Sequence, residues 1–332
     1  MSAHHTHWQP SASVQQLQRR ALLLRNIREY FFTQQVMETE VPILSSAATV
    51  DLHIESFCTE FTSGGTSAKK MYLHTSPEFA MKRLLAAGSG DIYYLGPVFR
   101  NGEYGRYHNP EFTMLEWYRC NLDDQQLMDD ISRLLTMVCD NYKELQRVSY
   151  QTLFQQHFGI NPHTVTTDVL TELVKTFVDE NLKDLADNDL LDLLFTHKIE
   201  PALHAKGEND TLSGVFVYDY PAGMAALARL KTDDQGQQVA ARFELFVNGI
   251  ELVNGYHELT TASEQQQRFL QDQQQRKAMH LPVYPYDKKL VAALHHGLPD
   301  CAGVALGIDR LHMLLTGETS IKDIMAFDFT RV

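Results

Sequence analysis

The chain has 332 residues, of which 44% are hydrophobic and 21% charged, and its formal net charge is −13. This balance is typical of a globular protein with a sizeable core, in one large domain or two. No apolar run approaches the roughly 20 residues that a membrane-spanning helix needs, and the polar start, residues 1–10, lacks the apolar core of a secretory signal.

The charge and the cysteines narrow the possible partners and compartments. An acidic chain disfavours tRNA or another nucleic acid as the main partner, because phosphate contacts need a basic face. The four cysteines form no metal-binding spacing. Their scarcity predicts a reduced, cytoplasmic setting, and the lack of a long apolar run predicts no membrane partner.

The first expected elements are a helix over residues 14–33 and two strands over residues 91–100 and 111–119. Residues 62–70, rich in Gly, Ser and Thr, are expected to join strands, and residues 101–110 form a polar loop. The apolar residues at helical spacing are Leu17, Ala21, Leu24, Ile27 and Phe31. The alternating face expected on the second strand carries Phe112, Met114, Glu116 and Tyr118.

The later elements include acidic helices over residues 168–197 and a hairpin of strands 243–247 and 250–254. The turn signal Asn248-Gly249 joins these two strands. A strand over residues 304–308 precedes a helix with Asp309 as its possible N-cap. The helix residues expected to face inward are Leu311, Leu314 and Leu315.

The strands occur mainly as hairpins, without the regular strand–helix alternation of a parallel sheet. The predicted fold class is therefore α+β, with an antiparallel sheet flanked by helices. No glycine-rich dinucleotide motif and no P-loop is present.

The loop over residues 101–110 carries the first chemical signal. Arg100 ends one strand, Phe112 begins the next, and Arg106 and His108 lie between them. A cationic hairpin with an aromatic face suits phosphates beside a stacked base. A solvated loop whose charges have no function is the alternative, and composition alone does not decide between the two.

Longer motifs point to a family. Residues 99–116 resemble motif 2 of class II aminoacyl-tRNA synthetases of the lysyl group, and residues 303–311 resemble motif 3. The helix around Arg28, followed by residues 38–42, is similar to motif 1. Other matches to the lysyl group are residues 75–78 with 82–83, and residues 242–244 through 249–259.

The resemblance covers roughly residues 15–332 and leaves too few residues ahead of motif 1 for an anticodon-binding OB-fold. We therefore expect a single catalytic domain, residues 1–332, with an acidic helical insertion at about residues 160–205 and no anticodon-binding domain. This arrangement resembles the elongation factor P–lysine ligases, whose members attach (R)-β-lysine to a lysine side chain of elongation factor P. The resemblance implies ATP as co-substrate, Mg²⁺, elongation factor P as acceptor and a homodimer.

The resemblance also implies roles for single residues. Arg100 and Arg310 would be the catalytic arginines on the α- and γ-phosphates, where a fixed guanidinium stabilises developing charge. Phe112 would stack on adenine, and Glu244 and Glu251 would bind Mg²⁺. The further ATP-binding positions are Asn101, Glu103, His108, Asn109, Leu245 and Gly307.

The implied amino-acid pocket suits a cation. Glu258 would meet the far ammonium of a lysine-type substrate, since a buried carboxylate needs a partner. The other implied pocket positions are Ser76, Glu78, Glu116, Tyr118, Asn254, Tyr256 and Ala305.

Two positions depart from the lysyl-tRNA synthetase pattern. Ala305 replaces a glycine, and its methyl group would favour a substrate with a displaced amino group, such as β-lysine. Gly102 replaces a glutamate that contacts ATP, and Glu103 is expected to take over that task, helped by the permissive glycine.

Two other functions remain open. One is a tRNA-charging lysyl synthetase that lacks its anticodon domain, and the other is a catalytically silent paralogue that binds lysine or ATP.

Overall fold

The computed structural model describes residues 8–64, 68–139, 143, 145–179, 185–203 and 213–332. It divides into two compact units. Unit 1 comprises residues 1–118, 260–299 and 306–332, and unit 2 comprises residues 119–259 and 300–305. No helix within the described ranges is long and apolar enough to cross a membrane.

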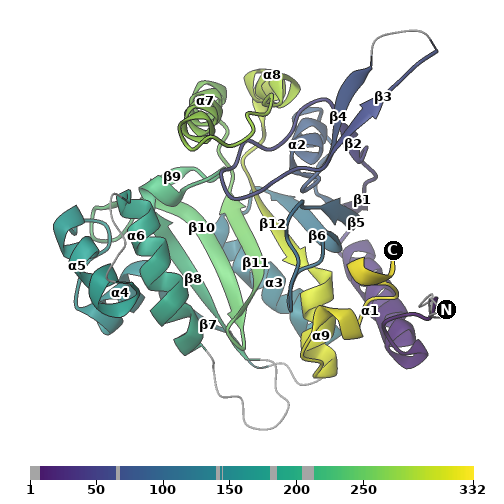
Figure 1. Cartoon of the computed structure of the whole chain (residues 1–332), viewed down its shortest axis with the longest axis horizontal. Coiled ribbons are helices and arrows are strands. Elements are labelled where there is room, and N and C mark those ends of the chain that lie inside the picture. Colours follow the sequence, from purple (N-terminus) through teal and green to yellow (C-terminus); the bar gives the residue numbers. More distant parts are fainter. Residues whose placement is uncertain (1–7, 65–67, 140–142, 144, 180–184, 204–212) are drawn as a thin grey trace, which may run out of the picture. The chain divides into compact units, whose positions relative to one another are not determined.

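Unit 1 contains helices on two short sheets (Figure 1). Strand β1 pairs in parallel with β5, β5 pairs antiparallel with β6, and the smaller sheet has the order β2-β4-β3. Its helices are α1 (Val14–Thr33), α2 (Glu78–Ala86), α7 (Ala262–Ala278), α8 (Lys288–Gly297) and α9 (Ile308–Thr316). Its strands are β1 (Met37–Glu38), β2 (Leu44–Ser45), β3 (Cys58–Phe61), β4 (Lys69–Leu73), β5 (Ile92–Phe99) and β6 (Glu111–Cys120), of which β6 belongs to unit 1 as far as residue 118.

Helix α1 has the predicted bounds. Ser13 caps it by accepting a hydrogen bond from the main-chain N–H of Gln16, at 3.2 Å. The expected inward face is partly wrong, because Ala21 is exposed. The buried side chains of this helix are Gln16, Leu23, Ile27, Tyr30 and Phe31. Phe31 fixes the face by stacking on Tyr93 of β5, with ring centroids 4.4 Å apart.

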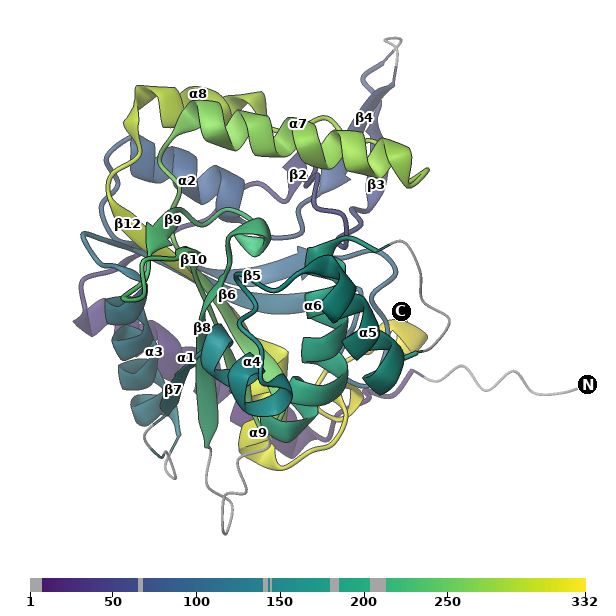
Figure 2. The ribbon, with the colours of Figure 1, turned by 90° about the vertical axis from the view of Figure 1, so that its left-hand side faces the viewer.

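Helices α7 and α8 lie side by side, and α8 packs on α2 (Figure 2). Arg276 at the end of α7 is fully buried. Its guanidinium donates to the carbonyl oxygens of Asp51, at 2.5 Å, and Pro282, at 2.7 Å, and forms an ion pair with Glu55. The Glu55 carbonyl in turn accepts from the N–H of Asn101, at 2.8 Å. This buried cation therefore braces the segment that pairs with the start of loop 101–110.

Unit 2 is a sheet covered on one side by helices α4, α5 and α6 (Figure 1). Strand β7 runs parallel to β8, while β8, β10 and β11 are antiparallel and β9 adds to β10. Its helices are α3 (Asp124–Val138), α4 (Tyr150–Phe158), α5 (Thr167–Phe177) and α6 (Asp187–Leu194). Its strands are β7 (Gln146–Ser149), β8 (Gly214–Pro221), β9 (Leu230–Thr232), β10 (Gln238–Val247), β11 (Ile250–His257) and β12 (Cys301–Gly307), of which residues 301–305 of β12 belong to unit 2.

The remaining described elements are short helical turns. They are a π-helical turn, Phe195–Ile199, and 3-10 turns Glu200–Leu203, Ala222–Met224, Ile321–Asp323 and Phe329–Arg331.

Several sequence predictions are confirmed, and two more need correction. The α+β class is confirmed, and the Asn248-Gly249 turn joins β10 and β11 with positive φ at both residues, 51° and 71°. Within residues 168–197, α5, α6 and the π-helical turn are helical, while the described residues 178–179 and 185–186 are not. The prediction that Asp309 caps α9 is wrong, since Gly307 is the N-cap. Leu314 and Leu315 are only half-buried. The strand predicted over residues 111–119 is confirmed as β6, in which residues 114–118 are all buried.

Instead of capping α9, Asp309 forms a buried ion pair. Its carboxylate, 1% exposed, forms an ion pair with Arg20 of α1 at 2.5 Å and accepts from the N–H of Thr113 of β6 at 2.7 Å. Arg20 also donates to the Thr113 hydroxyl, at 2.8 Å. One buried carboxylate thus joins α1, β6 and α9.

We predict that Asp309→Ala lowers the free energy of unfolding by about 3–5 kcal/mol, because it leaves the Arg20 charge without its buried partner. Urea denaturation measures this loss. The control is Glu264→Ala, which breaks the half-exposed i,i+4 pair with Arg268 on α7 and should cost about 0.5 kcal/mol or less. Equal losses in the two variants would contradict the anchoring role of Asp309.

A second prediction concerns Asp272 on α7. Burial, together with the charge of Asp51, raises the pKa of Asp272 to about 6, although Arg268 opposes this rise. The folded state therefore holds this proton more tightly than the unfolded chain, so ionisation costs stability as pH rises from about 4 to about 6. Asp272→Asn should stabilise the protein by on the order of 1 kcal/mol at pH 7, and the gain should vanish near pH 4. Denaturation midpoints of both proteins across this pH range test it; a gain independent of pH would exclude the linkage.

Candidate functional site

The predicted site residues fall into two groups, one in each unit. Unit 1 holds the groups around loop 101–110, the start of α2 and the start of α9. Unit 2 holds those on β10, β11 and the first part of β12.

In unit 1, Arg100 and Phe112 lie at adjoining ends of β5 and β6. The pairing runs from Ile92 opposite Tyr118 to Phe99 opposite Glu111, and the N–H of Arg100 donates to the Pro110 carbonyl at 2.9 Å. The Arg100 guanidinium lies over the Phe112 ring, 5.2 Å from its centroid. A cation and an aromatic face therefore stand together, as the loop sequence predicts.

Glu103 is the nearest acidic neighbour of Arg100, with 3.6 Å between carboxylate and guanidinium. Gly102 between them has φ +83°, in the left-handed region that favours glycine, and a methyl group there would meet no atom within 4 Å. Backbone conformation, and not crowding, thus accounts for a glycine at this position.

A second guanidinium comes from the first turn of α9. Arg310 donates to the Tyr107 carbonyl, at 3.3 Å, and contacts Nε2 of His108, at 2.7 Å. Because a guanidinium can only donate, Nε2 of His108 accepts, and the proton of the neutral ring is on Nδ1. The Cβ that an alanine would add at Gly307 lies 3.7 Å from the Arg310 side chain, so this turn passes close to the arginine.

Asn109 is turned toward the protein. Its amide donates to the Glu111 carbonyl, at 2.7 Å, and accepts from the N–H of Phe329, at 3.0 Å. The side chain is buried, with 5% exposed. A direct contact between Asn109 and ATP stays a prediction, while its bracing of the loop is an observed contact.

The acidic positions of unit 1 have internal partners. Glu116 is buried and accepts from the Tyr118 hydroxyl, at 2.8 Å, one position further along the same face of β6. Opposite Glu116, burial raises the pKa of Tyr94 to about 12, with a further rise from the Glu116 charge. Glu78 pairs with Lys82, at 2.5 Å, one helical turn along α2. The Ser76 hydroxyl accepts from the N–H of Glu78, at 3.4 Å, just ahead of Pro77, which is the N-cap of this helix.

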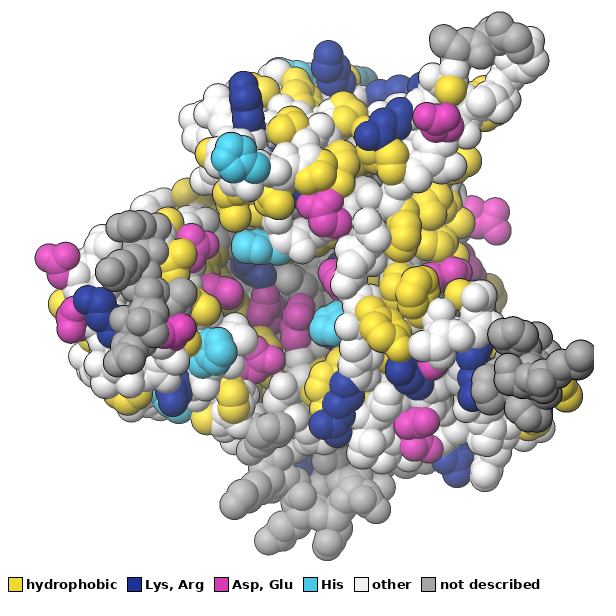
Figure 3. Space-filling model, viewed as in Figure 1, with side chains coloured by type: hydrophobic (Ala, Val, Ile, Leu, Met, Phe, Trp, Pro, Cys, Tyr) yellow, Lys and Arg dark blue, Asp and Glu magenta, His cyan; other side chains and the backbone are white. Residues whose placement is uncertain are grey.

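In unit 2, a bulge decides which side chains share a face. Glu244 of β10 lies opposite Asn254 of β11, but the register then shifts, and Phe246 lies opposite Glu251. Directly paired residues point to the same side of a sheet, so one extra residue in β11 turns Glu251 to the side of Glu244 and Asn254. Acidic side chains gather over β10 and β11 in Figure 3.

Glu244 is the centre of this face. Arg242 forms an ion pair with it, the Tyr220 hydroxyl donates to it at 2.7 Å, and the Asn254 amide donates at 3.3 Å. Burial raises the pKa of Glu244; Arg242 opposes this rise and the charge of Glu251 adds to it. The two carboxylates therefore repel each other, as ligands of one cation do before the cation binds.

The other pocket positions of unit 2 lie nearby along the strands. Tyr256 pairs with Arg242, whose guanidinium is 6.0 Å from the tyrosine ring centroid. Glu258 is 1% exposed, and its main chain is held by Cys301 and by Arg229. Leu245 is fully buried on the opposite face, so only its main chain is available to a ligand. Ala305 of β12 is half-buried.

Sequence reasoning did not select Arg242, Tyr220 or Lys82 as site residues. The spacing of Arg242 two residues before Glu244 on a strand, and of Lys82 four residues after Glu78 on a helix, are signals that could have found two of them. No local signal points to Tyr220, because its contact with Glu244 arises from strand pairing. Among the described residues, no group of three or more His, Cys, Asp or Glu side chains is placed to hold a metal ion by itself.

Comparison with known proteins supports the resemblance. The family model of the class II tRNA synthetases (D, K and N) matches residues 2–331. The chain is 48% identical over 330 residues to the elongation factor P–(R)-β-lysine ligase of Pseudoalteromonas translucida and 47% identical over 330 residues to that of Vibrio cholerae. It is 46% identical over 327 residues to the enzyme of that name from Salmonella paratyphi B. Each alignment covers 98% of both chains.

Proposed function

Because the chain belongs to the class II tRNA synthetases (D, K and N) and, within them, to the family of the elongation factor P–(R)-β-lysine ligases, we propose that it is a ligase that activates (R)-β-lysine with ATP and transfers it to a lysine side chain of elongation factor P. The observation that carries this proposal is that the chain is 46–48% identical to three such ligases over 98% of its length. The placement of Arg100, Phe112 and Arg310 around one loop supports ATP as the co-substrate.

The proposed reaction has two steps. The carboxylate of the amino acid attacks the α-phosphorus of ATP, the bond to the bridging oxygen breaks, and pyrophosphate leaves. The neutral amine of the acceptor lysine then attacks the carbonyl of the adenylate, and AMP leaves while the amine loses a proton. Positioning and charge stabilisation are sufficient for the first step, so no nucleophilic side chain is required.

The arginines supply the electrostatic part. Arg100, whose side chain is about a quarter exposed, would neutralise the charge that builds on the α-phosphate, and Arg310 the charge on the γ-phosphate. The contact between Arg310 and His108 limits the freedom of both side chains, so less entropy is lost when a phosphate binds.

Glu244 and Glu251 fit Mg²⁺ as a pair of carboxylates on one face. Mg²⁺ in such sites takes one or two carboxylates and completes its shell with substrate phosphates and water. When bound, Mg²⁺ would neutralise phosphate charge. Arg242 and Tyr220 keep Glu244 oriented and favour its ionised form.

Substrate selection would depend on Glu258 and Ala305. The buried Glu258 carboxylate suits the far ammonium of a lysine-type substrate. The Ala305 methyl group would disfavour an α-amino group where a glycine would admit it, by about 1–3 kcal/mol. The remaining assigned pocket groups are Ser76, Glu78, Glu116, Tyr118, Asn254 and Tyr256.

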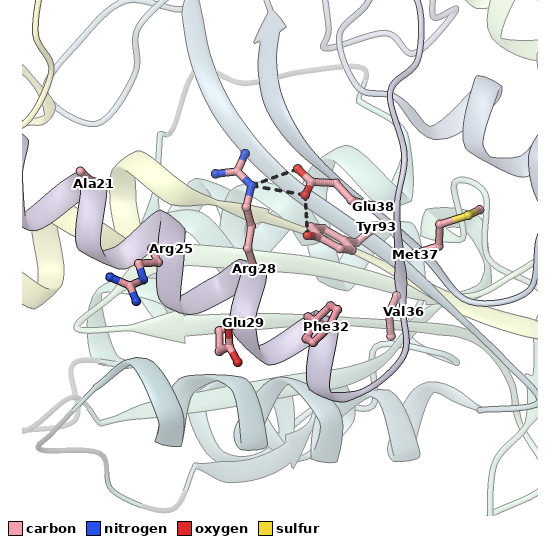
Figure 4. Close-up of a pocket in the computed structure, with 9 residues that line it drawn as sticks. All are labelled: Ala21, Arg25, Arg28, Glu29, Phe32, Val36, Met37, Glu38 and Tyr93. Carbon is pink, nitrogen blue, oxygen red and sulfur yellow. Dashed lines mark hydrogen bonds and ion pairs between the residues drawn. The ribbon is translucent and has the colours of Figure 1, made fainter.

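A homodimer through α1 and β1 is part of the proposal. Figure 4 shows a pocket on this face, in which Arg28 and Tyr93 both point to Glu38. The Arg28–Glu38 distance is 3.1 Å and the Tyr93 hydroxyl donates at 2.8 Å. Beside them, Phe32 is 78% exposed and Met37 is 50% exposed. Large apolar side chains so exposed at the motif 1 face suit burial by a second copy.

An acceptor competition tests the function. The protein is given ATP, Mg²⁺ and labelled (R)-β-lysine with elongation factor P and tRNA together, and label is expected on elongation factor P. Arg100→Ala should lower amino-acid-dependent ATP–pyrophosphate exchange by at least about 100-fold without unfolding the protein, while the exposed Arg19→Ala should leave it unchanged. Label on tRNA would make the chain a charging enzyme, and no exchange at all would make it a silent binder.

The dimer is tested separately. Phe32→Glu should shift the protein from dimer to monomer, because it places a charge in the apolar contact. Phe61→Glu, on the exposed strand β3, should leave the dimer intact. Sedimentation velocity distinguishes the two species. A monomeric unaltered protein, or equal behaviour of both variants, would refute this interface.

A further inference from the structure

The last residues of the chain contact the loop that carries the phosphate-binding groups. This C-terminal segment, residues 319–332, meets loop 101–110 at three places, all within unit 1. The contacts join residues more than 200 positions apart in the sequence, so no local sequence pattern predicts them.

The first contact is reciprocal. The N–H of Ile321 donates to the Arg106 carbonyl, at 2.9 Å, and the Arg106 guanidinium donates to the Thr319 carbonyl, at 2.6 Å. Ile321 is 2% exposed and Ile324 is fully buried, so this part of the segment is fixed to the core. A residue in the middle of the loop is therefore tied to a rigid base.

The second contact is aromatic and charged. The ammonium of Lys322 donates to the Tyr104 hydroxyl, at 2.8 Å, and lies 5.0 Å from the centroid of that ring. The Tyr104 and Phe329 rings are 5.8 Å apart. Both rings are about half exposed, so this contact alone would hold the loop weakly.

The third contact is buried. The N–H of Phe329 donates to the side chain of Asn109, at 3.0 Å, whose amide donates in turn to the Glu111 carbonyl, at 2.7 Å. Asn109 follows His108, which contacts Arg310. The segment thus acts on the end of the loop where two of the assigned nucleotide-binding groups meet.

The segment is itself anchored at the far side. The carbonyls of Met325 and Ala326 accept from the N–H groups of Ala12 and Ser11, at 3.0 and 2.8 Å, and the N–H of Asp328 donates to the Ser11 hydroxyl, at 3.1 Å. Residues ahead of α1 therefore complete the support.

We propose that Asn109 and the C-terminal segment are positioning elements that hold loop 101–110 in the conformation that binds the triphosphate of ATP. This inference rests on the proposed function. A loop ordered beforehand loses less conformational entropy when the ligand binds, so the C-terminal segment contributes to ATP affinity without touching ATP. Coupling between two sites is reciprocal, so ATP must also order the segment.

Two substitutions at Phe329 isolate the buried contact. Phe329→Pro removes the N–H that Asn109 accepts, whereas Phe329→Ala keeps it, and both remove the ring. Residue 329 is the first of a 3-10 turn, and Asp328 before it is extended, with φ −79° and ψ 171°. Proline is tolerated at such a position and requires such a predecessor.

Phe329→Pro should raise the KM for ATP in pyrophosphate exchange by about fivefold relative to Phe329→Ala, the effect of one lost hydrogen bond. The KM for the amino acid should be the same in both variants, and the lost hydrogen bond should lower the melting temperature of Phe329→Pro by only about 2–4 °C relative to Phe329→Ala. Calorimetric titration with ATP–Mg²⁺ should show the same fivefold difference in Kd. Combining Phe329→Pro with Asn109→Ala should raise the KM for ATP by no more than the larger single effect, because both substitutions remove the same hydrogen bond.

Hydrogen exchange on the unaltered protein gives a measurement free of any substitution. Adding ATP–Mg²⁺ should slow exchange at the amides of Ile321 and Phe329. Equal KM and Kd values for the two Phe329 variants, or exchange at these amides that ATP does not slow, would overturn the positioning role. An unaltered protein without pyrophosphate exchange would overturn the proposed function instead, and this inference with it.

Discussion

The buried carboxylate of Asp309 is the contact on which the rest of unit 1 depends. It joins α1, β6 and α9 through Arg20 and the N–H of Thr113, and these elements carry the segments similar to motifs 1, 2 and 3, in that order. A charge that is 1% exposed is tolerable only because a charged partner and a backbone donor compensate it. The residue beside it is Arg310, so the anchor that fixes the helix also fixes the direction from which that guanidinium approaches the loop.

The two groups of site residues are held by different means. Those of unit 1 lie largely on a loop, and hydrogen bonds from Arg310 and the last residues of the chain fix its shape. In unit 2, Glu244, Glu251 and Asn254 project from one face of a hairpin, where ladder hydrogen bonds and the ion pair of Arg242 with Glu244 fix them. A loop adapts to a flexible triphosphate, whereas a strand face suits a metal ion, whose ligands must be placed accurately.

Local patterns predicted the local features well. Helical spacing predicted the bounds of α1, and Asn248-Gly249 predicted the β10–β11 hairpin. The contacts of Asp309, Tyr220 and Asn109 were not predictable, because their partners come from distant segments. The expected cap at Asp309 failed for the same reason: its carboxylate is more strongly stabilised by Arg20 than by the helix start. The residue-by-residue roles came from the family resemblance, which physical patterns alone could not supply.

Because of the bulge in β11, the side of the sheet to which Glu251 points depends on whether the number of residues in the β10–β11 hairpin is odd or even. Glu244 and Glu251 share a face only because β11 has one residue more than β10 between their paired positions. A change that adds or removes a single residue there would send Glu251 to the opposite side without altering any side chain. Insertions or deletions in this hairpin are therefore tolerable only in steps of two residues. When hairpin tips are exchanged between relatives, the sequence of the tip can change freely, but the number of residues between Glu244 and Glu251 must stay even.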